Sequence, residues 1–152
     1  MEYSPKKVKS LLEEKDFNFK KKGGLKLADS RFYICEHCGN LVEMINNAGV
    51  PLMCCGQKMT LLEPGTVEAS AEKHIPEVKV NGNHVEIQVG SVKHPMLEEH
   101  YIQWIYLQTD KGSYRKSLAP GDAPVAIFTL NDEKPIAAYA YCNLHGLWKA
   151  EI

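Results

Sequence analysis

Four of the five cysteines in this chain are spaced in a way that suits a bound metal ion. Cys35 and Cys38 form a Cys-x-x-Cys pair, and Cys54 and Cys55 follow as an adjacent pair, with a glycine directly after each pair. A Cys-x-x-Cys turn aims two thiolates at one point, and a second pair completes a tetrahedral site for zinc or iron. Adjacent ligands are unusual in such sites, so we expect strain in the second pair. The glycines allow backbone N–H groups to approach the sulfurs.

The four sulfurs do not identify their metal, because zinc and iron both accept four thiolates. A zinc ion that only holds this part of the chain together is therefore an alternative to a redox-active iron. His37 lies between the first two cysteines. We assign it to the surface because four thiolates already complete a tetrahedron.

A second candidate site consists of one cysteine and four histidines, each at a point where a strand begins or a loop ends. These residues are His74, His94, His100, Cys142 and His145. Loops gathered at one end of a β-sandwich would bring all five to one metal. Imidazoles combined with a single thiolate favour a redox metal, and five ligands leave a sixth position open to a small substrate.

The alternative for this second set is a group of solvated histidines and a buried core thiol at Cys142. That interpretation is preferable for any one of the residues taken alone, whereas the five together favour a metal. His84 differs from the others because it directly follows a hairpin turn. We assign His84 to the surface.

The elements that must position these residues are mainly β-strands. Segment 84–89, HVEIQV, alternates apolar and polar residues and follows the hairpin signal Asn81-Gly82. Further strands are expected at 101–108, 123–130 and 134–142, with turns at 110–113 and 131–135. This spacing predicts an antiparallel β-sandwich.

The composition divides the chain into three parts. Residues 4–16 have helical spacing of apolar residues behind a Ser-Pro start, which predicts one short helix. The stretch from 31 to 65 holds too few apolar residues to form a core without a metal at its centre. We therefore expect an N-terminal extension with a short helix at 1–30, a metal module at 31–65 and the sandwich at 66–152.

Charge and hydropathy limit the possible partners and location. No apolar run approaches the roughly 20 residues of a membrane span, and the N-terminal lysines precede no apolar signal segment. We therefore expect a cytoplasmic protein with reduced cysteines and no membrane partner. Residues 1–26 hold eight lysines and four acidic residues, so the rest of the chain has 10 basic and 15 acidic side chains. This acidic balance argues against general nucleic-acid binding.

Several runs occur in an order that resembles the desulfoferrodoxin family. They are Cys-x-x-Cys-Gly, Cys-Cys-Gly, EKHIP, GSVKHPM, EEHYIQW and CNLHGLW, and they extend over residues 32–152. The resemblance implies a desulforedoxin-like module with one iron on Cys35, Cys38, Cys54 and Cys55. It also implies an immunoglobulin-like sandwich of the neelaredoxin type with a second, catalytic iron. The implied ligands there are His74, His94, His100 and His145 as equatorial imidazoles and Cys142 as the axial thiolate.

The same resemblance implies an enzyme that reduces superoxide to hydrogen peroxide by one electron without releasing dioxygen. Glu72 and Lys73 would lie beside the open iron position, the glutamate able to ligate oxidised iron and the lysine facing superoxide. Rubredoxin or a similar small carrier would supply electrons, and the family tends to form homodimers. The chain departs from the usual two-iron members because Cys35 lies some thirty residues further from the N-terminus.

Three other functions are alternatives to this one. A zinc-ribbon-type binding module would use only the four cysteines, and an electron carrier would need no open histidine site. Superoxide dismutation would require the iron to oxidise superoxide as well as reduce it. Measurement of dioxygen release distinguishes dismutation from reduction.

Overall fold

The computed structural model describes residues 29–67 and 69–152. The helix expected over 4–16, and nearly all of the extension at 1–30, lie outside these residues. Within them, no helix is long or apolar enough to cross a membrane.

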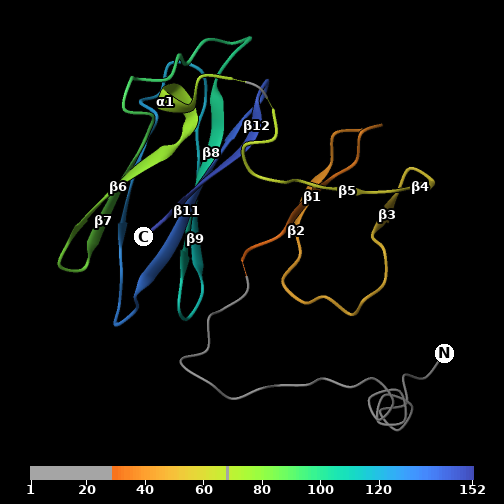
Figure 1. Cartoon of the computed structure of the whole chain (residues 1–152), viewed down its shortest axis with the longest axis horizontal. Coiled ribbons are helices and arrows are strands. Elements are labelled where there is room, and N and C mark those ends of the chain that lie inside the picture. Colours follow the sequence, from red (N-terminus) through yellow and green to blue (C-terminus); the bar gives the residue numbers. More distant parts are fainter. Residues whose placement is uncertain (1–28, 68) are drawn as a thin grey trace, which may run out of the picture.

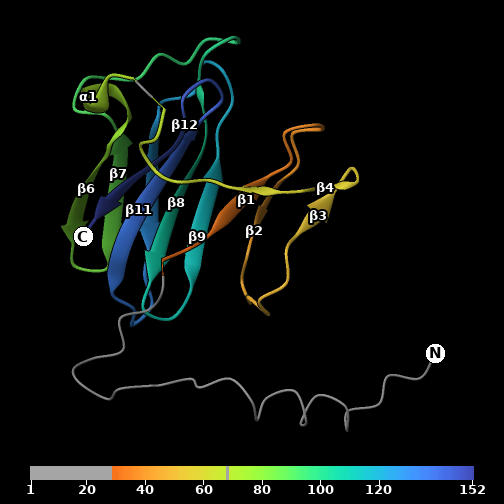
Figure 2. The same cartoon turned by 45° about the vertical axis from the view of Figure 1, so that its right-hand side comes forward.

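The larger part of the molecule is a sandwich of two antiparallel sheets (Figures 1 and 2). One sheet has three strands in the order β10-β7-β6, and the other has four in the order β12-β11-β8-β9. The strands are β6 (Pro76–Asn81), β7 (His84–Val89), β8 (Ile102–Thr109), β9 (Ser113–Ser117), β10 (Val125–Thr129), β11 (Pro135–Cys142) and β12 (Gly146–Glu151). The expected mainly β, immunoglobulin-like sandwich is confirmed.

Alternating side chains build the core between the two sheets. Val85, Ile87 and Val89 on β7 are fully buried, because every second side chain of a strand points to the same face. They pack with Ile105 and Leu107 of the opposite sheet. The hairpin expected at Asn81-Gly82 is present, and its two-residue loop is Gly82-Asn83, since Asn81 pairs with His84.

The four predicted strands are present, and several elements were not predicted. These include β6 and β12, each of six residues, and β9, which is mostly polar and exposed at the edge of its sheet. An edge strand buries little surface, so its sequence carries a weak hydrophobic pattern. The one-turn helix α1 (Ala71–His74) was also not predicted; it lies at one end of the sandwich (Figure 1).

The smaller part of the molecule contains five very short strands beside the sandwich (Figure 2). They are β1 (Phe32–Ile34), β2 (Leu41–Glu43), β3 (Met53–Cys54), β4 (Gln57–Lys58) and β5 (Thr60–Leu61). β1 pairs with both β2 and β5, and β3 pairs with β4. Among its described residues, only Phe32, Cys35 and Met59 are buried apolar side chains. We call residues 29–63 the module.

An aromatic cluster joins the module to the outer face of the four-stranded sheet. Phe32 is 2% exposed, and its ring lies 5.0 Å from Trp104, 5.1 Å from Tyr106 and 5.6 Å from Tyr139 between centroids. The contacts with the two tyrosines are edge-to-face, which aromatic rings favour by about 1 kcal/mol per pair. Phe32 therefore fixes the start of the module against the sandwich.

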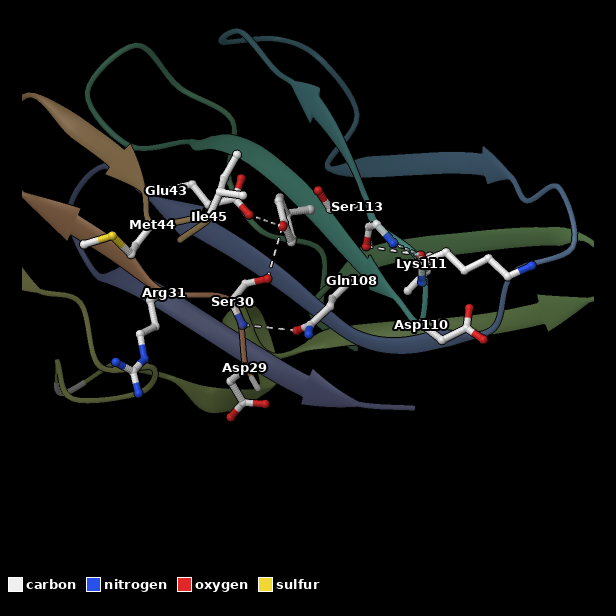
Figure 3. Close-up of a pocket in the computed structure, with 13 residues that line it drawn as sticks. Asp29, Ser30, Arg31, Glu43, Met44, Ile45, Gln108, Asp110, Lys111 and Ser113 are labelled. Carbon is white, nitrogen blue, oxygen red and sulfur yellow. Dashed lines mark hydrogen bonds between the residues drawn. The ribbon is translucent and has the colours of Figure 1, made fainter. Parts of the chain in front are cut away.

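Polar contacts extend this junction (Figure 3). The Tyr106 hydroxyl bonds to the Glu43 carboxylate of β2 and lies 3.1 Å from Ser30 Oγ. The backbone N–H of Ser30 donates to Gln108 Oε1 at 3.2 Å. These groups line a pocket of about 560 Å³ between the module and the hairpin of β8 and β9. The module is thus attached to the sandwich by apolar and polar contacts together.

Candidate metal centres

The four-cysteine site is formed by two turns of the module. Cys35 follows β1, and its carbonyl accepts a hydrogen bond from the N–H of Gly39 at 2.8 Å. The Sγ atoms of Cys38 and Cys54 lie 3.6 Å apart, and those of Cys54 and Cys55 lie 3.9 Å apart. A tetrahedral ion with bonds of about 2.3 Å places its sulfurs about 3.8 Å from one another. The sulfurs thus fit such an ion.

The adjacent cysteine pair contains the strain that its sequence predicts. Cys55 has a φ of 50°, a left-handed conformation that is uncommon for residues other than glycine. Adjacent side chains of an extended strand point to opposite faces. The left-handed backbone at Cys55 is therefore what allows Cys54 and Cys55 to face one point.

Contacts among the cysteines shift the pKa of two of these thiols in opposite directions. The pKa of Cys35 is lowered to about 6, mainly because the backbone N–H of Cys38 bonds to its sulfur. The pKa of Cys55 is raised to about 12, first because of its contact with the thiol of Cys38. The side-chain amide of Asn40 donates to Cys54 Sγ at 3.5 Å. Four thiolates this close together need a cation among them.

The second site lies at one end of the sandwich, where loops from both sheets meet. His74 ends α1, His94 and His100 lie between β7 and β8, Cys142 ends β11 and His145 lies in the turn to β12. The ligand atoms of these five residues all lie within 4.8 Å of one another. The structure therefore brings together all five candidates that the sequence singled out.

Backbone carbonyls orient two of the imidazole rings. Nδ1 of His74 donates to the carbonyl of Ser70 at 2.8 Å, and Nδ1 of His94 donates to that of Pro95 at 2.5 Å. Each Nε2 of these neutral rings therefore presents a lone pair. The two Nε2 atoms lie 3.1 Å apart, and His74 Nε2 lies 3.0 Å from His145 Nδ1. Lone pairs this close repel one another, so the arrangement fits a cation placed between them.

Burial favours the neutral form of three of the rings and leaves one nitrogen without a partner. Burial lowers the pKa of His74 and His100, and it lowers the pKa of His94 to about 4. Within the described part of the chain, His100 Nε2 is buried with no hydrogen-bond partner. Such unsatisfied buried atoms are rare. Burial also raises the pKa of Cys142, so a metal ion must displace the proton of that thiol.

Two further residues shape the site and were not identified from the sequence. The Trp148 indole stacks on His74 with centroids 4.9 Å apart, and its Nε1 donates to the carbonyl of His145 at 3.1 Å. A Cβ at Gly90 would lie 2.6 Å from the carbonyl oxygen of Lys73. Only glycine therefore permits α1 to approach this loop so closely. Trp148 could have been noticed because it ends the run CNLHGLW, which contains two candidate ligands. Nothing in the sequence around Gly90 indicates its role.

Glu72 and Lys73 lie on α1 with exposed side chains. The carbonyl of Glu72 accepts hydrogen bonds from the N–H of Val92 at 3.0 Å and from the hydroxyl of Ser91 at 3.2 Å. These bonds tie α1 to the loop between β7 and β8. After burial and the neighbouring histidines, the charge of Lys73 also contributes to the lowered pKa of His100.

The two remaining histidines are both exposed, in agreement with their surface assignment. His37 lies in the turn between the first two cysteines. His84 Nδ1 lies 3.0 Å from the Thr129 hydroxyl across the pair of β7 and β10. Neither histidine belongs to the two clusters of possible ligands.

Comparisons with known proteins agree with these two sites. The family model for the desulfoferrodoxin N-terminal domain matches residues 29–62, and the desulfoferrodoxin model matches residues 66–151. A desulfoferrodoxin of Nitratidesulfovibrio vulgaris is 50% identical over 119 residues, which cover 78% of this chain and 94% of that protein. A superoxide reductase of Pyrococcus abyssi is 33% identical over 99 residues, covering 53% of this chain and 86% of that protein.

A solved structure resembles the whole described fold. The superoxide reductase from Treponema pallidum superposes with a TM-score of 0.69 at 40% sequence identity. The match covers 82% of this chain and 100% of that one. On these matches and on its two clusters of possible ligands, the chain belongs to the desulfoferrodoxin family.

Proposed function

We propose that this chain is a superoxide reductase that converts superoxide to hydrogen peroxide with one electron and two protons, without releasing dioxygen. The observation that carries this function is the cluster of four imidazoles and one buried thiol at the end of the sandwich. Five ligands leave a coordination position for a small anion, and the family relationship supports iron as the metal.

We assign the ligands of the two irons residue by residue. His74, His94, His100, His145 and Cys142 would hold the catalytic iron, and Cys35, Cys38, Cys54 and Cys55 would hold the other. When bound as ferrous iron, the catalytic metal supplies the electron and a positive centre that attracts superoxide. The chain favours the neutral form of His74, His94 and His100 by burial. It also orients two of the rings through backbone carbonyls and excludes water from Cys142.

The remaining assignments follow from the same family. The electron donor is rubredoxin or a carrier like it, the protein acts as a homodimer, and the units extend over 31–65 and 66–152. Five free cysteines suit a reducing compartment, which supports a cytoplasmic location.

Replacing Lys73 by alanine should slow the second-order reaction with superoxide several-fold. Superoxide is an anion, so a positive side chain beside the site raises its encounter rate, and salt weakens this effect. Stopped-flow rates at increasing ionic strength should therefore show a flatter dependence in the variant. Lys134→Ala, at the opposite end of β11 from Cys142, is the matched control. Equal rates in wild type and Lys73→Ala at low salt would contradict this role.

Replacing Glu72 by alanine should shift the absorption band of the oxidised catalytic centre. The exposed carboxylate on α1 is close in sequence to His74 and is the acidic group proposed to bind oxidised iron. A hard oxygen ligand suits the ferric state better than the ferrous state. Absorption spectra recorded after one oxidising equivalent would detect the shift. Glu77→Ala, on β6, provides a control, and an unchanged band in Glu72→Ala would remove this assignment.

The proposed function is tested first by metal analysis of anaerobically purified protein. Two irons per chain, with a thiolate-to-iron band of the catalytic site that appears on oxidation, would support it. Superoxide consumption that yields peroxide and no dioxygen then distinguishes reduction from dismutation. One zinc and no iron, with failed reconstitution by ferrous iron, would contradict the function and favour a structural zinc module.

A further inference from the structure

We propose that Asn143 is a positioning residue that holds His100 at the catalytic metal, an inference that rests on the proposed function. Asn143 is half-buried in the turn between β11 and β12, between Cys142 and Leu144. Its Oδ1 also lies 3.9 Å from Cys142 Sγ. Its effect is on the backbone at both sides of His100.

His100 differs from the other imidazoles in how its ring is held. His74 and His94 each donate Nδ1–H to a backbone carbonyl, and Nδ1 of His145 lies 3.0 Å from His74 Nε2 and 3.6 Å from Cys142 Sγ. Among the residues that the structure describes, the His100 ring makes no hydrogen bond, and its Nε2 is buried without a partner. Metal-binding histidines are usually oriented by a hydrogen bond from the second ring nitrogen. The direction of the His100 ring must therefore come from its backbone and from ring packing.

Asn143 fixes that backbone on both sides of His100. Its Oδ1 accepts the N–H of Tyr101 at 2.9 Å, and its Nδ2 donates to the carbonyl of Glu99 at 2.9 Å. The N–H of Asn143 itself donates to the carbonyl of Tyr101 at 3.2 Å. One amide side chain thus spans the residues before and after His100. A second clamp on the same loop is the bridge between Leu97 and His100.

The position of Asn143 in the chain links this clamp to the thiolate. Asn143 directly follows Cys142, and His145 is two residues further on. The two hydrogen bonds of this side chain therefore help to hold the His100 loop against the thiolate loop, together with the backbone bond from Asn143 to Tyr101 and the pairing of Cys142 with Ile102. Metal affinity depends steeply on such distances, because ligands must converge within a few tenths of an ångström. Removal of a supporting group of this kind costs roughly 10- to 100-fold in metal affinity.

The first test uses the metal-free protein, so it does not depend on the proposed activity. In Asn143→Ala, hydrogen exchange of the Tyr101 amide should become about fivefold faster, because its acceptor is lost. Asn143→Asp keeps an acceptor for that amide and should keep its slow exchange. Asn47→Ala, which removes the acceptor of the Gly49 amide in the module, is the matched control and should leave Tyr101 unchanged. Unchanged exchange in Asn143→Ala would overturn the clamp.

The second test asks whether Asn143 acts through His100. Ferrous iron is titrated anaerobically into metal-free protein against a coloured chelator, and the catalytic site is followed by its thiolate-to-iron band after oxidation. Asn143→Ala should weaken iron binding there roughly 10- to 100-fold in the wild-type background and in His94→Ala. In His100→Ala the same change should have less than about a twofold effect, because coupled residues are not additive.

The outcomes of this cycle separate the inference from the proposed function. An equal loss of iron affinity in all three backgrounds would mean that Asn143 only stabilises the turn, and would overturn the inference. If wild-type protein bound iron at this site but did not reduce superoxide, the proposed function would fail while the positioning role of Asn143 stood.

Discussion

Cys142→Ala should lower the rate of superoxide reduction by more than about 100-fold. Loss of groups that only support a metal ligand costs roughly 10- to 100-fold, and Cys142 is the one sulfur among the five candidate ligands of its site. Its thiolate is also the group that donates electron density to the iron. The rate is measured by stopped flow per catalytic iron, so that poor loading is not mistaken for slow reaction.

The same variant has a spectroscopic outcome that is independent of rate. The thiolate-to-iron band of the catalytic site should be absent from Cys142→Ala after oxidation, whereas the absorption of the four-cysteine site should remain. Asn143→Ala offers a comparison, since it should weaken iron binding but keep the band in the fraction that is loaded. A band of full intensity in Cys142→Ala would show that another group supplies the thiolate.

Cys35→Ser should unfold the module and leave the sandwich folded. The module buries only Phe32, Cys35 and Met59 among its described apolar side chains, which is too little to stabilise about 35 residues. Structural metals in small cysteine modules contribute about 10 kcal/mol or more to folding. The sandwich has its own core between two sheets and does not need the module for it.

Hydrogen exchange measured by mass spectrometry tests this difference between the two parts. Amides of β1 and β2 should lose protection in Cys35→Ser, while those of β7 and β11 keep theirs. Removal of metal from the wild type by a chelator should give the same pattern, and returning ferrous iron or zinc should restore protection. Cys142→Ala is the matched cysteine control and should leave β1 protected. Persistent protection of β1 in metal-free protein would mean that docking on the sandwich alone folds the module.

Much of the sandwich could be predicted from the sequence because buried strands impose a two-residue period. Segment 84–89 matches β7 at both ends, and 134–142 matches β11 to within one residue. The polar edge strand β9 has no such period, since little of it is buried. The short strands β3 and β4 could not be predicted for another reason. Each has two residues, and the turn at the adjacent cysteines determines their conformation.

The candidate metal ligands could be predicted because cysteine and histidine are the residue types that bind such metals. The residues that hold these ligands in place could not be predicted. Cysteine and histidine runs identify the groups that meet a metal, and the structure gathers those groups into two clusters. Trp148, Gly90 and Asn143 act through stacking, close approach and backbone clamping. These roles depend on contacts between loops that are far apart in the chain, and a single sequence does not show which loops are in contact.

The insertion of Phe32 among Trp104, Tyr106 and Tyr139 sets an order of events during synthesis. The chain is made from its N-terminus, so the module leaves the ribosome before β8 and β11 exist to receive this ring. All four of its cysteines are then available before the first histidine ligand is made. The other cluster is complete only once His145 has been made, after β11 and directly before the last strand, β12. The four-cysteine site can therefore bind metal during synthesis, while the other site is still incomplete.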